Sequence, residues 1–387
     1  MNSIENNRVD IKVKVDKALK RLEKECLIQR NGDEFFFLTD DEQDVNREIK
    51  EIKVDTGEIL RQINSQIFDG ILDTSKVKVK ATDNTYNLGK KIDEQIFSNS
   101  NGRLLIHLMT PYHDENKDDV RVKLYTQRDP YTLFVRMSET DNYMNEIREY
   151  IQIDRYVSNK MATNPPESII RILQMKQGEK RGRAARIKDY LIKALENARF
   201  YMNGNELDIQ AKSAKERMGE ALETYALNVY RNSVLVKNHY DEKKIKTILS
   251  YEYSPSLFAN EKELINNPNF EAIKEVENYM RDLTERFDVI NMKKLIDKFS
   301  DIHYGWRELD IQGIITELFA ISRVTIKFDG EELDIENKKN AADVLIYAKA
   351  SNQEKLIILP KGEKPVELIK KAISLLKQLY GANKCLC

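Results

Sequence analysis

The chain has 387 residues, 41% of them hydrophobic and 33% charged, which is enough apolar sequence for several domains with cores of their own. Its 63 basic and 64 acidic residues leave a net charge of −1, so no overall positive field attracts DNA or a membrane surface, and any nucleic-acid contact must come from a local patch. Three cysteines are too few for a disulfide framework, and the sequence has no signal peptide or long apolar segment. We therefore expect a cytoplasmic protein that does not enter a membrane.

The first predicted element is an amphipathic helix that leads into a β-hairpin, over residues 15–38. The apolar positions of the helix recur at helical spacing and are Val15, Ala18, Leu19 and Leu22. Two β-rich runs then flank Asn31-Gly32, and Asn-Gly between apolar runs favours a tight hairpin because both residues accept a positive φ. A charged helix followed by a two-stranded wing is the second half of a winged helix-turn-helix. Only fourteen residues precede it, so we expect this winged helix to lack its first two helices.

Residues 39–137 are predicted to form two helices and then a small sheet. Thr39, followed by three acidic residues, is typical of a helix N-terminus, and apolar stripes predict helices that reach residue 53 and then cover residues 56–67. From residue 76 the apolar residues alternate, which is typical of strands. The predicted strands are residues 77–82, 103–110, 120–126 and 131–137. The polar turns between them favour a largely antiparallel sheet.

Helical spacing dominates after residue 142. The predicted helices cover residues 142–156, 166–198, 214–230 and 270–287, and Pro165-Pro166 marks a boundary. A second helix–wing unit follows, with a helical stripe and then a hairpin around Asp329-Gly330 over residues 324–335. The stripe consists of Ile311, Ile314, Ile315 and Leu318. The last predicted elements are a helix over residues 341–347, a strand over residues 355–359 and a helix over residues 365–380.

We therefore predict a helix-dominated, multi-domain α+β chain. Residues 1–72 form a partial winged helix with the helices that follow it, and residues 73–160 form a small β-rich domain. Residues 161–290 form a helical domain. Residues 291–387 form a winged-helix-like unit with a C-terminal strand and helix.

No motif in the sequence indicates catalysis. A phosphate-binding loop needs a glycine-rich turn followed by a Lys-Ser/Thr pair, and the nearest strings, Gly89-Lys90-Lys91 and residues 178–183, lack both the spacing and the hydroxyl. The four histidines are far apart, Cys385 and Cys387 have no further ligand nearby, and Trp306 is expected to fill a corner between helices. We predict no catalytic, cofactor-binding or metal-binding residue, and hence no enzyme. ATP and Mg²⁺ would be cofactors only if a P-loop domain preceded this chain.

Two basic stretches are candidates for nucleic-acid contact. The first lies on the opening helix and its wing, and its residues are Lys17, Lys20, Arg21, Lys24 and Arg30. The second lies on a later helix, and its residues are Lys176, Lys180, Arg181, Arg183, Arg186 and Lys188, with Glu179 as the only acid among residues 176–188. Lysine and arginine side chains on such helices can neutralise phosphates. The alternatives are a solvated helix face for the second stretch and a winged helix that packs against other domains for the first.

The residues also resemble a known family. The string from Phe37 to Asn46, after a helix and a wing, resembles the region just after the ATPase core in the large P-loop protein of BREX bacteriophage-defence systems, the BrxC or PglY family. Met109-Thr110-Pro111 in a β-rich segment and a basic helix after Glu167 occur in the same order. Tyr304-Gly305-Trp306 and the helix Asp-Ile-x-Gly-Ile-Ile from Asp310 follow, and a strand and a helix end the chain.

The resemblance implies a role in phage defence. The family has an AAA+-like P-loop ATPase domain before this region, and the present chain lacks the Walker motifs, so no nucleotide-binding residue carries over. The resemblance therefore implies a non-catalytic scaffold. Its expected partners are other defence-system proteins, a second copy of itself and double-stranded DNA, with no membrane partner.

Two other functions stay open at this point. The first is a free-standing winged-helix regulator that reads duplex DNA with the helix around Arg21. The second is an unrecognised metal-dependent nuclease built from scattered carboxylates.

Overall fold

The structure, a computed structural model, describes residues 2–31, 34–73, 75–98, 104–138, 143–249, 265–333, 341, 344–346 and 350–361. The chain divides into two compact units, and the division falls inside a helix. The first unit comprises Met1–Val77 and Thr85–Tyr225, and the second comprises Lys78–Asn84 and Ala226–Cys387. The helix-dominated α+β class is confirmed. None of the described helices is both long and apolar enough to cross a membrane. The four domain ranges stay a prediction.

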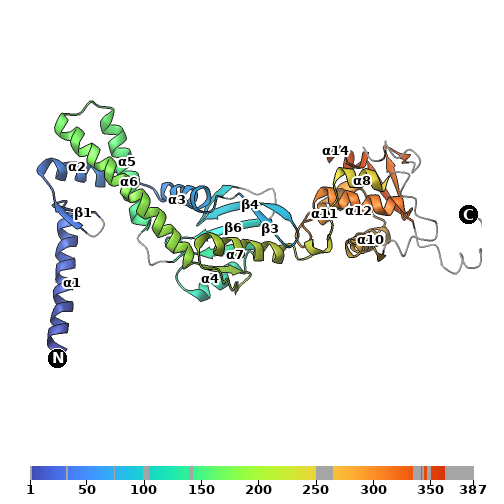
Figure 1. The fold of residues 1–387 in the computed structure, drawn as a ribbon, viewed down its shortest axis with the longest axis horizontal. Helices are drawn as coiled ribbons and strands as arrows, with labels where there is room; N and C mark the ends of the chain where they lie inside the picture. Colours follow the sequence, from blue (N-terminus) through green and yellow to red (C-terminus); the bar gives the residue numbers. More distant parts are fainter. Residues whose placement is uncertain are drawn as a thin grey trace, which may run out of the picture. The chain divides into compact units, whose positions relative to one another are not determined.

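The opening helix–wing comprises α1 (Asn2–Lys24), β1 (Ile28–Asn31) and β2 (Glu34–Phe37), as Figure 1 shows. The predicted helix and hairpin are confirmed, although the helix begins well before Val15. The helix ends because Cys26 takes a φ of 59°, and Leu27 N–H then donates to Leu22 O at 3.0 Å. The chain therefore turns directly into the wing.

Three short helical segments follow the wing: α2 (Asp40–Glu51), α3 (Thr56–Asn64) and the π-helix η1 (Ser65–Ile71). The predicted helix start at Thr39 is confirmed, because Thr39 N–H donates to the Glu42 carboxylate at 2.8 Å. Asp55 caps α3 by accepting from Glu58 N–H at 2.8 Å.

A seven-stranded mixed sheet forms the centre of the first unit. Its strands are β3 (Lys76–Val79), β4 (Asn84–Ile92), β5 (Gln95–Ser98), β6 (Leu104–Met109), β7 (Thr132–Arg136), β8 (Arg199–Met202) and β9 (Asn205–Glu206). Six lie in the order β3-β4-β6-β7-β8-β9, and β5 pairs with β4. Strands β4, β6 and β7 are parallel, whereas β8 is antiparallel to β7. The sheet therefore draws strands from both sides of the boundary predicted at residue 160.

One predicted strand of this sheet is wrong. Residues 120–126 are not a strand but part of the helix α4 (Asp119–Thr126), which Asp118 caps by accepting from Arg121 N–H at 2.9 Å. The sheet is mixed: β5, β8 and β9 each form antiparallel pairs, whereas the neighbouring strands β4, β6 and β7 pair in parallel. Parallel β6 and β7 need a crossover between them, and α4 lies in that crossover. Val120, Val122 and Leu124 alternate with polar residues, which is the pattern of a strand with one apolar face. Of these three residues only Val122 is buried in the helix, and Val120 and Leu124 are exposed.

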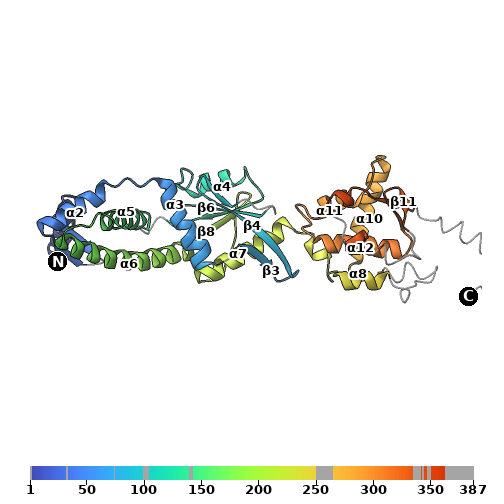
Figure 2. The same ribbon diagram turned by 90° about the horizontal axis from the view of Figure 1, so that it is seen from above.

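Three longer helices complete this unit: α5 (Tyr143–Met161), α6 (Glu167–Glu196) and α7 (Ala214–Val229). Helices α5 and α6 lie side by side, as Figures 1 and 2 show. Their apolar core also includes Val45 and Ile49 of α2. On α7, the Tyr225 hydroxyl donates to Tyr131 O at 2.5 Å and accepts from Leu105 N–H at 2.9 Å, which ties this helix to the strand region.

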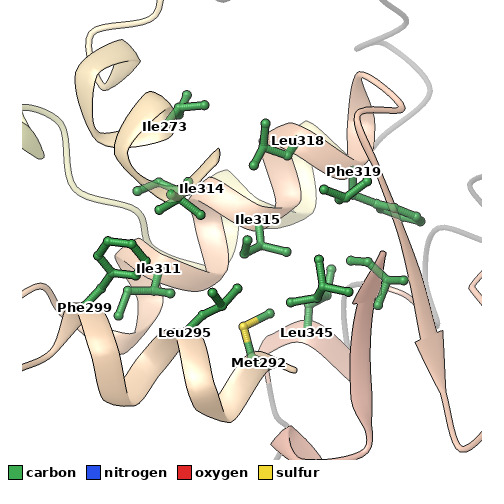
Figure 3. Close-up of a cluster of buried hydrophobic side chains, with 14 of the residues drawn as sticks. Ile273, Met292, Leu295, Phe299, Ile311, Ile314, Ile315, Leu318, Phe319 and Leu345 are labelled. Carbon is green, nitrogen blue, oxygen red and sulfur yellow. The ribbon is translucent and has the colours of Figure 1, made fainter. Parts of the chain in front are cut away.

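The second unit is built from helices around a three-stranded sheet. Its elements are η2 (Ser233–Leu235), α8 (Glu242–Ile248), α10 (Phe270–Glu285), α11 (Met292–Phe299), α12 (Glu308–Ala320), β10 (Val324–Phe328), β11 (Glu331–Glu332), α14 (Ala350–Gln353) and β12 (Leu356–Pro360). The predicted second helix–wing is confirmed: α12 leads into β10, and β10 turns into β11 through Asp329 and Gly330, both at positive φ. Figure 3 shows the apolar core, in which Ile311, Ile314 and Ile315 of α12 meet α10 and α11.

Some predictions fall outside the described residues. These are the helix over residues 365–380, Cys385 and Cys387, the last residues of the hairpin after Leu333, and part of the helix over residues 341–347. The structural role predicted for Trp306 is confirmed. Its ring stacks on Phe299 at 4.9 Å between centroids, and its indole N–H donates to Asn232 O at 2.9 Å.

Candidate nucleic-acid interface

The opening helix–wing presents a basic surface. Lys17, Lys20, Arg21 and Lys24 are exposed, and their spacing places them on one face of α1. Arg30 is also exposed, and its guanidinium carbon lies 5.6 Å from the centre of the Phe35 ring. Arg21 pairs with Glu25 at 3.1 Å, and this solvent-exposed ion pair contributes little to stability. The four cations of α1 thus share one face of the helix, and Arg30 lies on the wing.

The opening helix–wing also exposes apolar side chains, which the residue pattern did not predict. The exposed apolar side chains are Ile11, Val13 and Val15 on α1, and Phe35, Phe36 and Phe37 on β2. Phe37 is 87% exposed. The signal in the sequence was the run Phe-Phe-Phe in a strand of a short hairpin. Alternation would have placed at least one of these rings inside, yet all three are exposed.

The second basic stretch, residues 176–188 on α6, is divided between the interior and the surface. Lys176 and Arg183 are buried, at 5% and 6% exposure. The Arg183 guanidinium lies within ion-pair distance of three carboxylates, Glu146 at 2.8 Å, Glu149 at 2.6 Å and Glu179 at 3.0 Å. We call these four residues and Lys176 the ion network. Its two cations are buried and paired with carboxylates, so Lys176 and Arg183 do not form part of a surface for phosphates.

The pKa shifts in the ion network show which interactions dominate. Burial alone would raise the pKa of Glu179, but the charges of Lys176 and Arg183 outweigh burial and hold that pKa below its ordinary value. For Glu149, burial is the largest effect and raises its pKa despite the nearby Arg183. The pKa of Arg183 is raised because three carboxylates together outweigh its desolvation. Arg183 is therefore the residue on which the charge balance depends.

The other predicted residues of this stretch lie nearer the surface. Lys180 pairs with Asp154 at 2.6 Å, and Arg186 lies 3.4 Å from Glu146. Arg181 and Lys188 are exposed. The stretch is therefore not a continuous basic face, because acidic side chains from α5 interrupt it.

We predict that Arg183→Ala destabilises the protein by about 3–5 kcal/mol, because it leaves three carboxylates near one another without their shared cation. The measurement is the free energy of unfolding by urea, followed by circular dichroism. Arg181→Ala, an exposed arginine on the same helix, is the matched control and should change stability by less than about 0.5 kcal/mol. Equal effects of the two substitutions would contradict the importance of the network.

In the second winged helix, the helix that would enter a DNA groove is internal. The helix before the wing supplies the base contacts in winged and related helix-turn-helix proteins, and that position belongs to α12. Every residue from Asp310 to Phe319 is buried, including the polar Gln312, Thr316 and Glu317. A helix that is buried on all sides has no surface that could enter a DNA groove. The second unit thus has the topology of a winged helix, but its α12 is not exposed for DNA contact.

One segment covers the outer side of α12. It consists of residues 236–249, which include α8, and we call it the cover segment. The Tyr240 ring lies directly against Gly313, since a Cβ built on that glycine would be only 2.2 Å from the ring. Val236, Ile245 and Leu249 of the cover segment are buried in the same apolar core. Glycine at position 313 is therefore what allows the ring to pack on the helix backbone.

Polar contacts hold the cover segment at the start of α12. The fully buried Asp310 carboxylate accepts from Tyr240 N–H at 2.9 Å, from His239 Nδ1 at 2.9 Å and from Arg307 Nε at 2.9 Å. Burial by itself would raise the pKa of Asp310, but these hydrogen bonds outweigh it and hold the pKa below its usual range. On the other side of the imidazole, His239 Nε2 lies 2.6 Å from Thr82 O. His239 and Asp310 thus make structural contacts.

We predict that Gly313→Ala destabilises the protein by about 1–3 kcal/mol, because the new methyl group overlaps the buried Tyr240 ring. Thermal unfolding measures the effect. Gly219→Ala in α7 is the matched control, because no atom lies within 4 Å of its added Cβ. That control should stabilise by up to about 1 kcal/mol through helix propensity. A Gly313→Ala protein as stable as the control would refute the packing of Tyr240 on α12.

A polar cluster at the carboxyl ends of the parallel strands is the remaining candidate site, because ligands often bind there in α/β sheets. Asp93 accepts from both the amide and the hydroxyl of Thr110, at 2.8 and 2.6 Å. The Asn116 amide donates to Met109 O at 3.1 Å and Thr110 O at 2.9 Å. Burial lowers the pKa of His107 to about 3, so its imidazole is neutral. These contacts join strand ends to the following loops, which indicates a structural role.

The fold combines a helix–wing, a mixed six-strand order and a second winged helix whose recognition helix is internal. It thereby defines a region of a multi-domain protein. Residues 52–225 match the family described as BREX ATP-binding protein BrxC 4th domain with six-stranded beta sheet. Residues 232–362 match the BREX ATP-binding protein BrxC winged helix-turn-helix domain. The chain therefore belongs to the BrxC family of BREX proteins, and the resemblance found in the sequence is confirmed. No solved structure matches it.

Proposed function

We propose that this region is a scaffold that holds partner proteins in BREX defence and carries no chemistry of its own. The observation that carries the proposal is the burial of α12, because it makes the winged helix a packing module instead of a groove reader. Assembly through other defence-system proteins, or through a second copy of the chain, is the function that such a module supports. ATP and Mg²⁺ would act in a P-loop domain outside this region.

The winged-helix regulator would have to read a duplex with the helix around Arg21, because α12 of the second winged helix is buried. For α12 to read a duplex, the cover segment would have to leave, which would expose Tyr240 and remove the hydrogen bond from its amide to the buried Asp310 carboxylate. The nuclease gains no support. Among the residues that the structure describes, no group of three histidine, cysteine or acidic side chains could hold a metal ion.

A DNA contact is the second proposed function, and it belongs to the opening helix–wing. The exposed lysines and arginines of α1 face solvent on one side of the helix. On α6, by contrast, carboxylates take up much of the basic charge. We therefore propose that phosphates meet α1 and Arg30.

We predict that replacing Lys17, Lys20, Arg21 and Lys24 with alanine weakens DNA binding. Each lost phosphate contact should reduce the slope of log affinity against log salt by about 0.9 on duplex DNA. Fluorescence anisotropy at several salt concentrations measures this slope. Arg181→Ala/Lys188→Ala, which removes two exposed cations from α6, is the control and should leave the slope unchanged. An unchanged slope in the quadruple variant would contradict the DNA contact.

The scaffold role needs a separate measurement. Each other protein of the same defence system should be co-expressed with this chain and the mixture analysed by size-exclusion chromatography. We expect a stable complex with at least one of them, and it should persist in the quadruple variant. Failure to find any complex, including one between copies of the chain, would contradict the scaffold role and leave the DNA result unaffected.

A further inference from the structure

The exposed phenylalanines of the wing need a partner. Phe35, Phe36 and Phe37 are 38%, 50% and 87% exposed, and they are three of the four residues of β2. Single exposed apolar residues are ordinary on soluble proteins, but a contiguous patch marks an interaction site. The patch lies on a two-stranded hairpin.

The strand register divides these rings between the two faces of the hairpin. Arg30 lies opposite Phe35 and Ile28 lies opposite Phe37, so these four side chains share one face. Phe36 lies opposite Gln29 on the other face. Because strand residues two apart are about 7 Å from each other, Phe35 and Phe37 form two separate aromatic platforms on the face that also carries Arg30. Arg30 stands over the first of them.

The wing is held in place from its other face. The Gln29 amide donates to Glu179 at 2.5 Å, and Gln29 Oε1 accepts from Lys176 Nζ at 2.7 Å. These contacts join the hairpin to α6, where both partners are buried. The platforms are therefore presented on an anchored hairpin, which lowers the entropy lost when a ligand binds.

The surrounding charge indicates the chemistry of the partner. The described side chains of α1 and the wing include more cations than anions. The cations are Lys12, Lys14, Lys17, Lys20, Arg21, Lys24 and Arg30, and the anions are Asp16, Glu23, Glu25 and Glu34. Such a surface is complementary to a polyanion. A polyanion that also offers flat faces to aromatic rings is a nucleic acid whose bases are not paired.

We propose that the opening helix–wing binds single-stranded nucleic acid, with phosphates along the basic face of α1 and bases stacked on Phe35 and Phe37. The proposal rests on the DNA contact proposed above and specifies the kind of strand. In a duplex the faces of the bases are covered by their neighbours, so the rings would have nothing to stack on. Stacking accepts every base, so binding should have little sequence preference.

The test is fluorescence anisotropy of the full chain with a labelled oligothymidylate and with a duplex of mixed sequence. Base stacking contributes about 1–3 kcal/mol per base, so Phe37→Ala should weaken single-strand binding by about 5- to 150-fold. Phe35→Ala should act in the same direction, and Phe37→Trp should retain binding. The matched control is Phe287→Ala, because Phe287 is 96% exposed but belongs to the second unit.

The outcomes separate the two proposals. Single-strand binding that Phe37→Ala leaves unchanged, while the quadruple lysine and arginine variant loses it, would overturn stacking and keep the phosphate contact. Absence of single-strand binding would overturn the inference, and duplex binding that depends on α1 would still support the proposed DNA contact. Loss of a protein complex in Phe37→Ala, without any effect on single-strand binding, would assign the rings to a protein partner and would also overturn the inference. Selective single-strand loss on Phe37→Ala and Phe35→Ala supports it.

Discussion

The contact between Tyr240 and Gly313 determines what the second winged helix can do. An aromatic ring can lie on the backbone of α12 only where no Cβ projects, and the glycine provides that place. With the ring in this position, the cover segment buries the side of α12 that would face a DNA groove. The Asp310 carboxylate accepts hydrogen bonds from the Tyr240 amide and the His239 ring, so these polar groups of the cover segment have partners. A fold often associated with DNA reading is in this way used for internal packing.

The two helix–wing units of the chain have opposite surfaces. In the second helix–wing, α12 is buried, and the cover segment that precedes it in the chain contributes to that burial. In the first, α1 exposes cations and apolar residues together, and the wing exposes phenylalanines. Fold alone therefore does not assign function to either unit. The difference lies in the side chains around the helix: α12 is buried, whereas α1 exposes Lys17, Lys20, Arg21 and Lys24.

Several features of the fold could be predicted from local sequence. Asn31-Gly32 and Asp329-Gly330 located both hairpins, and the helical stripes located α1 and α12. The strand predicted over residues 120–126 was wrong because Asp118 caps a helix there, and because parallel strands need a crossover between them.

The prediction of a basic face on α6 missed the acidic partners for a different reason. Glu146 and Glu149, which pair with Arg183, come from another helix, and a window around residues 176–188 cannot contain them. The burial of α12 had a sequence signal, a glycine and an aspartate within a strongly apolar helix, but its cause, Tyr240, lies far upstream.

Gln29 gives the wing and the α5–α6 pair a common thermodynamic property. The Glu179 carboxylate serves Gln29, Lys176 and Arg183 at the same time, so the position of the wing and the charge state of the ion network are linked. Linkage is reciprocal: whatever stabilises the wing in its present position must also stabilise Glu179 in its ionised form. A ligand that stabilises the wing in this position would therefore also hold the Glu179 carboxylate of α6 in its ionised form.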